Sequence, residues 1–282
     1  MDSQLLVVNG SVVAALVGAW LYFRRFHPTR PPVGVFNRVD VLVMFVGLVA
    51  VPYLYLVLPP WLAAAFLAIG MVSILTLALQ PVLRRTGMRW AAVAFLMLAD
   101  VVLAVGPGAT SPSFMAVNNL VLVAAVVGTA AFWAQSGMRA ADLALLVAGV
   151  TVYDVFATTQ VSVMQDIFAR LSAVPFVPLV SWGDAGRVLS AGLGDLLVAA
   201  VFPLVMRKAF GRRAGFFGLV SGLVVIVAML TTLYLTRAHI VIPAMVVLGP
   251  LLLAQIAYWR HSATERRTRE YLLAEPLAVA VR

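Results

Sequence analysis

Three aspartates, Asp100, Asp154 and Asp195, lie within long apolar segments of the chain and are therefore candidates for chemistry. A charged aspartate inside a membrane-spanning helix costs at least ~2.5–3.5 kcal/mol, so such a residue is usually kept for a function. No basic residue lies at depth in these segments to neutralise the charge. Depth along the segments decides which of the three carboxylates can meet.

Asp154 and Asp195 are predicted to lie at the same depth in consecutive segments. Asp154 is about five residues from the end of segment 141–159, and Asp195 about six residues from the start of segment 189–206. At ~1.5 Å per residue, both lie roughly 7–9 Å from the same boundary. Two carboxylates about 3 Å apart share one proton, so one can draw a proton from water while the other protonates a carbonyl oxygen. The pair therefore favours the chemistry of aspartic proteolysis.

Small and helix-breaking residues accompany this pair. Gly192 and Gly194 precede Asp195 in the stretch GLGD, and small residues let a helix or a substrate backbone approach closely. The alternative for this stretch is a tight packing site. Pro243 lies near the start of the last apolar segment, where its missing N–H frees a carbonyl that could bind an extended peptide. Taken alone, Pro243 fits an ordinary helix kink better.

The composition is that of a membrane protein. Hydrophobic residues make up 63% of the 282 residues and charged residues 11%, whereas soluble domains are nearer 45–50% apolar and about 25% charged. The chain contains no cysteine, which excludes disulfides, thiolate metal sites and cysteine nucleophiles. The net charge of +9 indicates arginine-rich loops on one side of a bilayer, and no nucleic-acid partner is expected.

A spanning helix needs about 20 mostly apolar residues. The segments that meet this condition are 5–23, 39–58, 61–80, 89–105, 114–134, 141–159, 189–206, 214–235 and 239–259. The sequence thus predicts an all-α polytopic membrane protein with nine transmembrane helices. We expect residues 1–138 to form a scaffold, 139–260 to carry the catalytic helices, and 261–282 to form a cytoplasmic tail. The long outer loop 160–188 is expected to lie in the membrane interface, either gating access to the pair or without a gating role.

Basic residues are distributed unevenly between the two sides of these segments. Of the 20 Lys and Arg residues, only Arg170, Arg187 and Arg237 lie on one side, and the other 17 lie on the opposite side. By the positive-inside rule, the N-terminus is predicted to face outward and the C-terminus to face the cytoplasm. An odd number of spans is required for this orientation.

Three short motifs occupy the sixth, seventh and ninth predicted spans: Tyr153-Asp154, Gly192-Leu193-Gly194-Asp195 and Pro243-Ala244-Met245. In order, span number and spacing they resemble the YD, GxGD and PAL motifs of the presenilin and signal peptide peptidase family of intramembrane aspartyl proteases. The resemblance covers residues 141–259, and the first five spans agree only in number. It departs from the family at Met245, where the family has leucine, a change that roughly conserves volume.

The resemblance implies that Asp154 and Asp195 are the catalytic pair of an intramembrane aspartic endopeptidase. By the same resemblance, other residues shape the site or position the substrate: Tyr153, Gly192 and Gly194 for the first role, Pro243, Ala244 and Met245 for the second. Water is the nucleophile in this chemistry, so neither a metal nor an organic cofactor is implied. The predicted orientation is similar to that of the signal peptide peptidase branch, whose substrates are type II segments or signal peptides within the lipid bilayer. The composition suggests a microbial homologue in a bacterial plasma membrane.

Asp100 lies at a depth similar to that of Asn118 and Asn119 in the next segment. We expect these three residues to form a hydrogen-bonded polar clamp between the fourth and fifth spans. The alternative is a role for Asp100 in delivering protons.

The main alternative function is a proton-coupled transporter or channel, because intramembrane carboxylates serve such proteins too. Transporters of this kind often contain inverted repeats with broken helices, and the sequence has no visible repeat. A zinc protease of the HExxH type lacks its ligands here. Ser221 and His239 could suggest a serine–histidine pair, but Ser221 lies in no matching motif.

Overall fold

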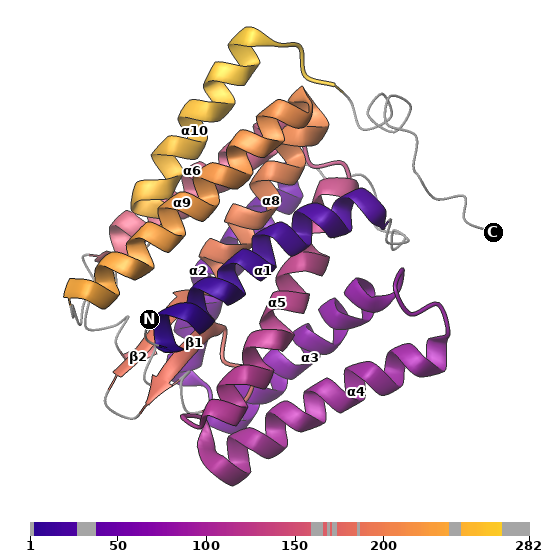
Figure 1. Ribbon diagram of the computed structural model, residues 1–282, viewed down its shortest axis with the longest axis vertical. Coiled ribbons are helices and arrows are strands. Elements are labelled where there is room, and N and C mark those ends of the chain that lie inside the picture. Colours follow the sequence, from indigo (N-terminus) through magenta and orange to yellow (C-terminus); the bar gives the residue numbers. More distant parts are fainter. Residues whose placement is uncertain are drawn as a thin grey trace.

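The computed structural model describes residues 3–26, 38–158, 166–167, 170, 174–184, 187–236 and 244–266. Within these residues the chain forms nine α-helices and one β-hairpin (Figure 1). The elements are α1 (Ser3–Arg25), α2 (Arg38–Val57), α3 (Pro60–Leu79), α4 (Thr86–Leu103), a π-helical turn η1 (Ala104–Gly108), α5 (Pro112–Gln135), α6 (Ala140–Thr158), β1 (Leu179–Asp184), β2 (Arg187–Gly192), α8 (Leu193–Phe210), α9 (Arg212–Thr236) and α10 (Met245–Ser262).

The helices coincide with the predicted apolar segments, because each segment is long enough to satisfy its own backbone hydrogen bonds as a helix. Among the described helices, five are long and apolar enough to cross a membrane: α1, α3, α4 with η1, α5 and α9. α8 contains three charged residues, Asp195, Arg207 and Lys208, and is not among these five. The structure thus confirms an α-helical protein with candidate membrane spans, and the crossing of the membrane by all nine helices stays a prediction.

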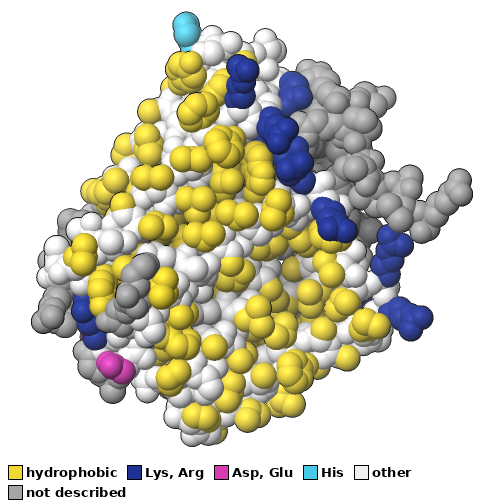
Figure 2. Space-filling view, in the orientation of Figure 1, with side chains coloured by type: hydrophobic (Ala, Val, Ile, Leu, Met, Phe, Trp, Pro, Cys, Tyr) yellow, Lys and Arg dark blue, Asp and Glu magenta, His cyan; other side chains and the backbone are white. Residues whose placement is uncertain are grey.

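The surface of the helical bundle is covered with large apolar side chains. Trp61 and Ile69 of α3 are 71% and 70% exposed, and Phe95 of α4 is 71% exposed. Figure 2 shows hydrophobic side chains across most of one face, with lysine and arginine gathered mainly along one edge. Soluble monomers rarely expose so continuous an apolar surface, so lipid is the environment that this face fits.

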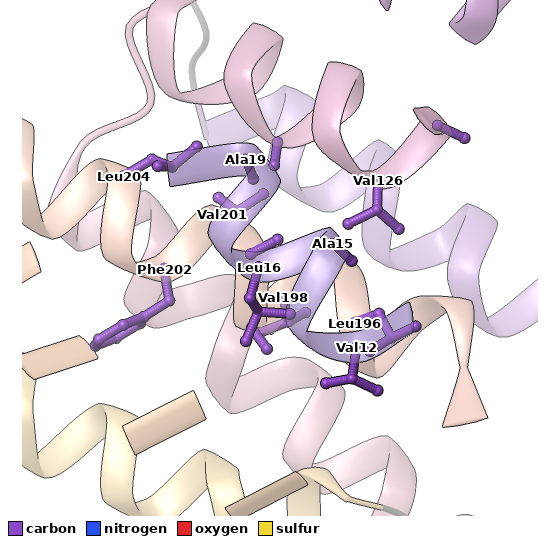
Figure 3. Close-up of a cluster of buried hydrophobic side chains, with 14 of the residues drawn as sticks. Val12, Ala15, Leu16, Ala19, Val126, Leu196, Val198, Val201, Phe202 and Leu204 are labelled. Atoms are coloured by element: carbon purple, nitrogen blue, oxygen red, sulfur yellow. The ribbon is translucent and has the colours of Figure 1, made fainter. Parts of the chain in front are cut away.

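α8 lies at the centre of the bundle and is the helix that carries Asp195. Most of its residues from Leu196 to Ala209 are buried. Figure 3 shows α8 and α5 meeting α1 through a set of small and branched side chains, among them Val12, Ala15, Leu16, Ala19, Val126, Leu196, Val198 and Val201. This single core joins the expected scaffold helices to the expected catalytic helices, so the position of Asp195 depends on both parts of the chain.

The β-hairpin is the part of the fold that the sequence analysis missed. β1 and β2 pair antiparallel, with Leu179 opposite Gly192 and Asp184 opposite Arg187. The hairpin lies at the end of the bundle where the N-terminus lies (Figure 1). A side chain at Gly183 would come within 2.0 Å of the Arg187 carbonyl oxygen, so this close approach of the two strands requires glycine.

One expectation is corrected by the hairpin. The predicted helix 189–206 starts later, at Leu193, because the residues before it form β2. The interfacial position expected for the loop 160–188 stays a prediction, and part of its described stretch 174–184 packs against the protein core. Phe176 and Val180 are 2% and 0% exposed. Much of the rest of that loop lies outside the described residues.

Candidate active site

Asp154 is the buried residue on an otherwise exposed turn of α6. Its side chain is 9% exposed, whereas Val152, Val155 and Phe156 are more than half exposed. Helical periodicity places Asp154 on a different face of α6 from these three exposed apolar residues. α6 therefore presents one carboxylate to the interior of the bundle.

The N-terminus of α10 meets this carboxylate. The backbone N–H of Met245 donates a hydrogen bond to Asp154 Oδ2 at 3.2 Å. The first N–H groups of a helix have no partner within it, so a carboxylate is a natural acceptor for them. Met245 is fully buried at this position, and its backbone, rather than its side chain, makes the contact. The expected role of Met245 and Ala244 in positioning substrate stays a prediction, and Pro243 lies outside the described residues.

Gly249, one turn further along α10, lets the two helices approach. A Cβ added at Gly249 would lie 1.9 Å from Thr151 Oγ1 and 3.0 Å from Thr151 Cβ. Thr151 is held in place, because its hydroxyl donates to the Val147 carbonyl oxygen at 2.7 Å. Thr151 precedes Asp154 by three residues and shares its face of α6. The Thr151–Gly249 contact therefore sets the distance between Asp154 and the start of α10.

Asp195 reaches the same place from α8. It is the third residue of that helix, with Gly192 as the residue that caps the N-terminus. The expected depth of about six helical residues was wrong, because β2 and not helix precedes Leu193. A helix N-terminus stabilises a nearby negative charge. Taken as a whole residue, Asp195 is half-buried.

The two aspartates are brought together as predicted. The charge of Asp154 acts on Asp195, and the backbone of Ala244 hydrogen-bonds to the Asp195 carboxyl group. Consecutive N–H groups at the start of α10, from Ala244 and Met245, thus bind one carboxyl group each. α6, α8 and α10 each contribute one part of this candidate site, and a pair of aspartates in this arrangement can share a proton.

The glycines and the tyrosine near the pair lie at different places around it. A Cβ at Gly192 would lie 3.4 Å from Asp195 Oδ2, an ordinary contact distance that places Gly192 beside this carboxyl group. Gly194 lies in the first turn of α8 and is half-buried. Tyr153 is also half-buried and immediately precedes Asp154 on α6.

Asp100 was expected to hydrogen-bond to Asn118 or Asn119, but it binds neither of them. All three instead bind the chain between 176 and 181. Asp100 Oδ1 accepts from the Phe176 N–H at 2.9 Å, and Asn118 Nδ2 donates to the Val177 and Leu179 carbonyl oxygens, both at 3.1 Å. The clamp between the fourth and fifth spans therefore exists through a third segment, which the sequence analysis treated as a loop.

Ser221, His239 and possible metal ligands were the residues considered for other chemistries. Ser221 Oγ is bound by Gln255 Nε2 at 2.6 Å, which links α9 to α10, and His239 lies outside the described residues. Within the described part of the chain, no group of three or more His, Asp or Glu side chains is placed to hold a metal ion.

The geometry of this site is the basis for a functional assignment, because comparison with known proteins provides none: no protein-family model and no curated protein matches the chain.

Proposed function

We propose that this protein is an intramembrane aspartic endopeptidase that hydrolyses peptide bonds within transmembrane segments. The observation that carries the proposal is the meeting of Asp154 and Asp195 at the N-terminus of α10, where the backbone of Ala244 and Met245 binds the two carboxyl groups. Both aspartates come from apolar helices, so their joint burial has a high cost unless it serves a reaction.

In the proposed reaction, one aspartate of the pair is ionised and the other is protonated. The ionised carboxylate removes a proton from water as the water oxygen attacks the carbonyl carbon of the scissile peptide bond. The protonated carboxyl group donates its proton to the carbonyl oxygen. When the resulting gem-diol collapses, the C–N bond breaks, the nitrogen takes the proton gained from water, and a diol proton returns to the other aspartate. The Met245 N–H, by holding Asp154 Oδ2, orients that carboxyl group throughout.

β2 supports the proposal because it offers a place for an extended substrate. The Leu193 N–H donates to the Pro178 carbonyl oxygen at 3.0 Å, which makes Pro178–Leu193 a hydrogen-bonded pair of the antiparallel ladder. Alternation along the ladder then directs the backbone groups of Val188, Ser190 and Gly192 away from β1. In the described part of the chain, no strand pairs with this edge.

A substrate strand added to this edge would run toward Asp195, which follows Gly192 by three residues. A transmembrane helix must unwind before water can attack its backbone, and an open strand edge compensates the hydrogen bonds that unwinding breaks. The distribution of basic residues favours an N-terminus outside and a C-terminus in the cytoplasm. With this orientation, the resemblance to the signal peptide peptidase branch favours type II transmembrane segments or signal peptides as substrates.

The test is cleavage of a synthetic type II transmembrane peptide by the purified protein in liposomes. Asp154→Asn and Asp195→Asn are each expected to lower the rate by at least ~100-fold while leaving the protein folded, because each removes one of the two proton-transfer groups. Asp40→Asn, at the start of α2, is the matched control and should retain full activity. Equal products from the unmodified protein and both site variants would refute the proposal. Ion-driven transport that is insensitive to aspartyl protease transition-state inhibitors would support a transporter instead.

A further inference from the structure

Three buried polar side chains on α4 and α5 lie outside the proposed catalytic pair. Asp100, Asn118 and Asn119 are 0%, 0% and 4% exposed. Placing an amide or carboxyl group in an apolar bundle is costly unless hydrogen bonds compensate it. Here the compensating bonds go to the backbone of one segment, residues 176–181, which includes the first residues of β1. We refer to Asp100, Asn118 and Asn119 as the hairpin anchor.

The anchor binds backbone groups at several positions along this segment. Asp100 Oδ1 accepts from the Phe176 N–H at 2.9 Å. Phe176 has φ = 61°, a left-handed conformation that is unfavourable for a bulky residue and needs support from its surroundings. Asn118 binds the next carbonyl groups, those of Val177 and Leu179, at 3.1 Å each.

Asn119 completes the anchor by acting as a strand partner. Its Nδ2 donates to the Ser181 carbonyl oxygen and its Oδ1 accepts from the Ser181 N–H, both at 2.9 Å. Leu179 and Ser181 are the residues whose backbone groups point away from β2 in the ladder. The anchor therefore occupies the outer edge of β1, and the outer edge of β2 is the one left for a substrate.

The hairpin is also joined to Asp195 without an intervening loop. β2 ends at Gly192 and α8 begins at Leu193, whose N–H is bound by the Pro178 carbonyl oxygen at 3.0 Å. A slip of the hairpin by one residue would turn every side chain to the opposite face and move the β2 edge along its axis relative to Asp195. The position of the hairpin is thus coupled to the distance between a paired substrate residue and the catalytic carboxyl group.

From these contacts we infer that Asp100, Asn118 and Asn119 are positioning residues that determine which peptide bond of the substrate is cut. The inference rests on the proposed protease function and extends it to site selection. The anchor fixes the hairpin on α4 and α5, the hairpin fixes the register of the substrate strand, and the register selects the bond that reaches Asp154 and Asp195. For Asp100, the function requires a hydrogen-bond acceptor and no proton transfer.

The test compares conservative and disruptive variants in the liposome assay, with mass spectrometry of the products. Asp100→Asn keeps an acceptor for the Phe176 N–H and should retain the cleavage pattern and rate of the unmodified protein. Asp100→Ala and Asn119→Ala remove the anchor bonds. Both should spread cleavage over neighbouring bonds and raise KM roughly tenfold, the effect of about one lost buried hydrogen bond, with a smaller change in kcat.

Thermal unfolding of each variant in detergent identifies those that remain folded, and only these are compared. An unchanged cleavage pattern and KM in folded Asp100→Ala and Asn119→Ala would overturn this inference. The proposed protease function would stand, since the protein would still cleave the peptide. A folded but inactive Asp100→Asn would also overturn the inference, because Asp100 would then take part in proton transfer. No cleavage by the unmodified protein would instead refute the proposed function, and this inference with it.

Discussion

Replacement of Gly249 by alanine is the most direct perturbation of the candidate site. The new Cβ would lie 1.9 Å from Thr151 Oγ1 and 3.1 Å from Thr151 Cγ2. The threonine hydroxyl is held by the Val147 carbonyl oxygen at 2.7 Å, on the helix that carries Asp154. Relief of the clash therefore requires α10 to move away from α6.

The size of this movement follows from the contact distances. Carbon and oxygen atoms in ordinary contact are about 3.5 Å apart, so α10 must shift by more than ~1 Å. The Met245 N–H to Asp154 Oδ2 distance is already 3.2 Å, and a shift of this size would break that bond. Misplacement of catalytic groups by about 1 Å can cost ~100-fold in rate, and overpacking costs about 1–3 kcal/mol of stability. The gain in helix propensity, about 1 kcal/mol, has the opposite sign and is smaller.

The assay is kcat for peptide cleavage by protein that is folded, measured beside thermal unfolding. Gly249→Ala should lower kcat by ~100-fold. Thr151→Ala in the same chain removes Oγ1 and Cγ2 and leaves only the Cβ contact at 3.0 Å, so the double variant should regain most of the lost rate. Gly70→Ala in α3, where an added Cβ meets nothing within 4 Å, is the matched control and should be active.

Two results would refute this reasoning. Full activity of Gly249→Ala would mean that the α6–α10 distance does not set the geometry of the aspartate pair. Failure of Thr151→Ala to restore activity, with both variants folded, would mean that the loss arises elsewhere than at the Thr151–Gly249 contact.

Further substitutions test the surrounding framework. Gly128→Ala should lower the unfolding temperature, because its Cβ would come within 2.2 Å of Ala78 Cβ, an overlap that costs about 1–3 kcal/mol. Ser221→Ala should keep full protease activity and lose about 1 kcal/mol of stability, since its hydroxyl binds Gln255 and takes no part in the proposed reaction; loss of activity in the folded variant would revive the serine-based alternative. Lys208→Met should destabilise the protein by about 1–3 kcal/mol while kcat stays unchanged, because the Lys208 ammonium group donates to two buried carbonyl oxygens at 2.7 and 2.5 Å. Unfolding curves and kcat measured on the same preparation check all three.

The helices were largely predictable because apolar length is a local property. A run of about 20 apolar residues forms a helix in lipid whatever surrounds it, since only a helix or a closed barrel satisfies its backbone there. The hairpin was missed for a related reason. Residues 189–192 are Leu-Ser-Ala-Gly, which contain no charged residue, proline or turn signal that would separate them from the helix that follows. Their pairing with 179–182 is a contact between segments, which apolar periodicity does not reveal.

The candidate site was predictable in part. The two aspartates were identified by residue type, since a carboxyl group in an apolar span is unusual wherever it occurs. The prediction of hydrogen-bond partners for Asp100 was wrong. It rested on the matched depth of Asn118 and Asn119 in the neighbouring span. Phe176, its actual partner, lies 76 positions away along the chain. The donor is a backbone N–H, which every residue except proline has, so no residue type in the sequence identifies it.

The amino-acid sequence by itself determined where the helices lie and which carboxyl groups are available for chemistry. Both the length of an apolar run and the type of each ionisable side chain are local properties of the sequence. Only the tertiary structure decided that Asp195 lies in the first turn of its helix, that the start of α10 binds both aspartates, and that a glycine on α10 lets this helix approach α6. These features depend on backbone groups and on close contacts between distant segments, and such contacts arise only when the whole bundle packs.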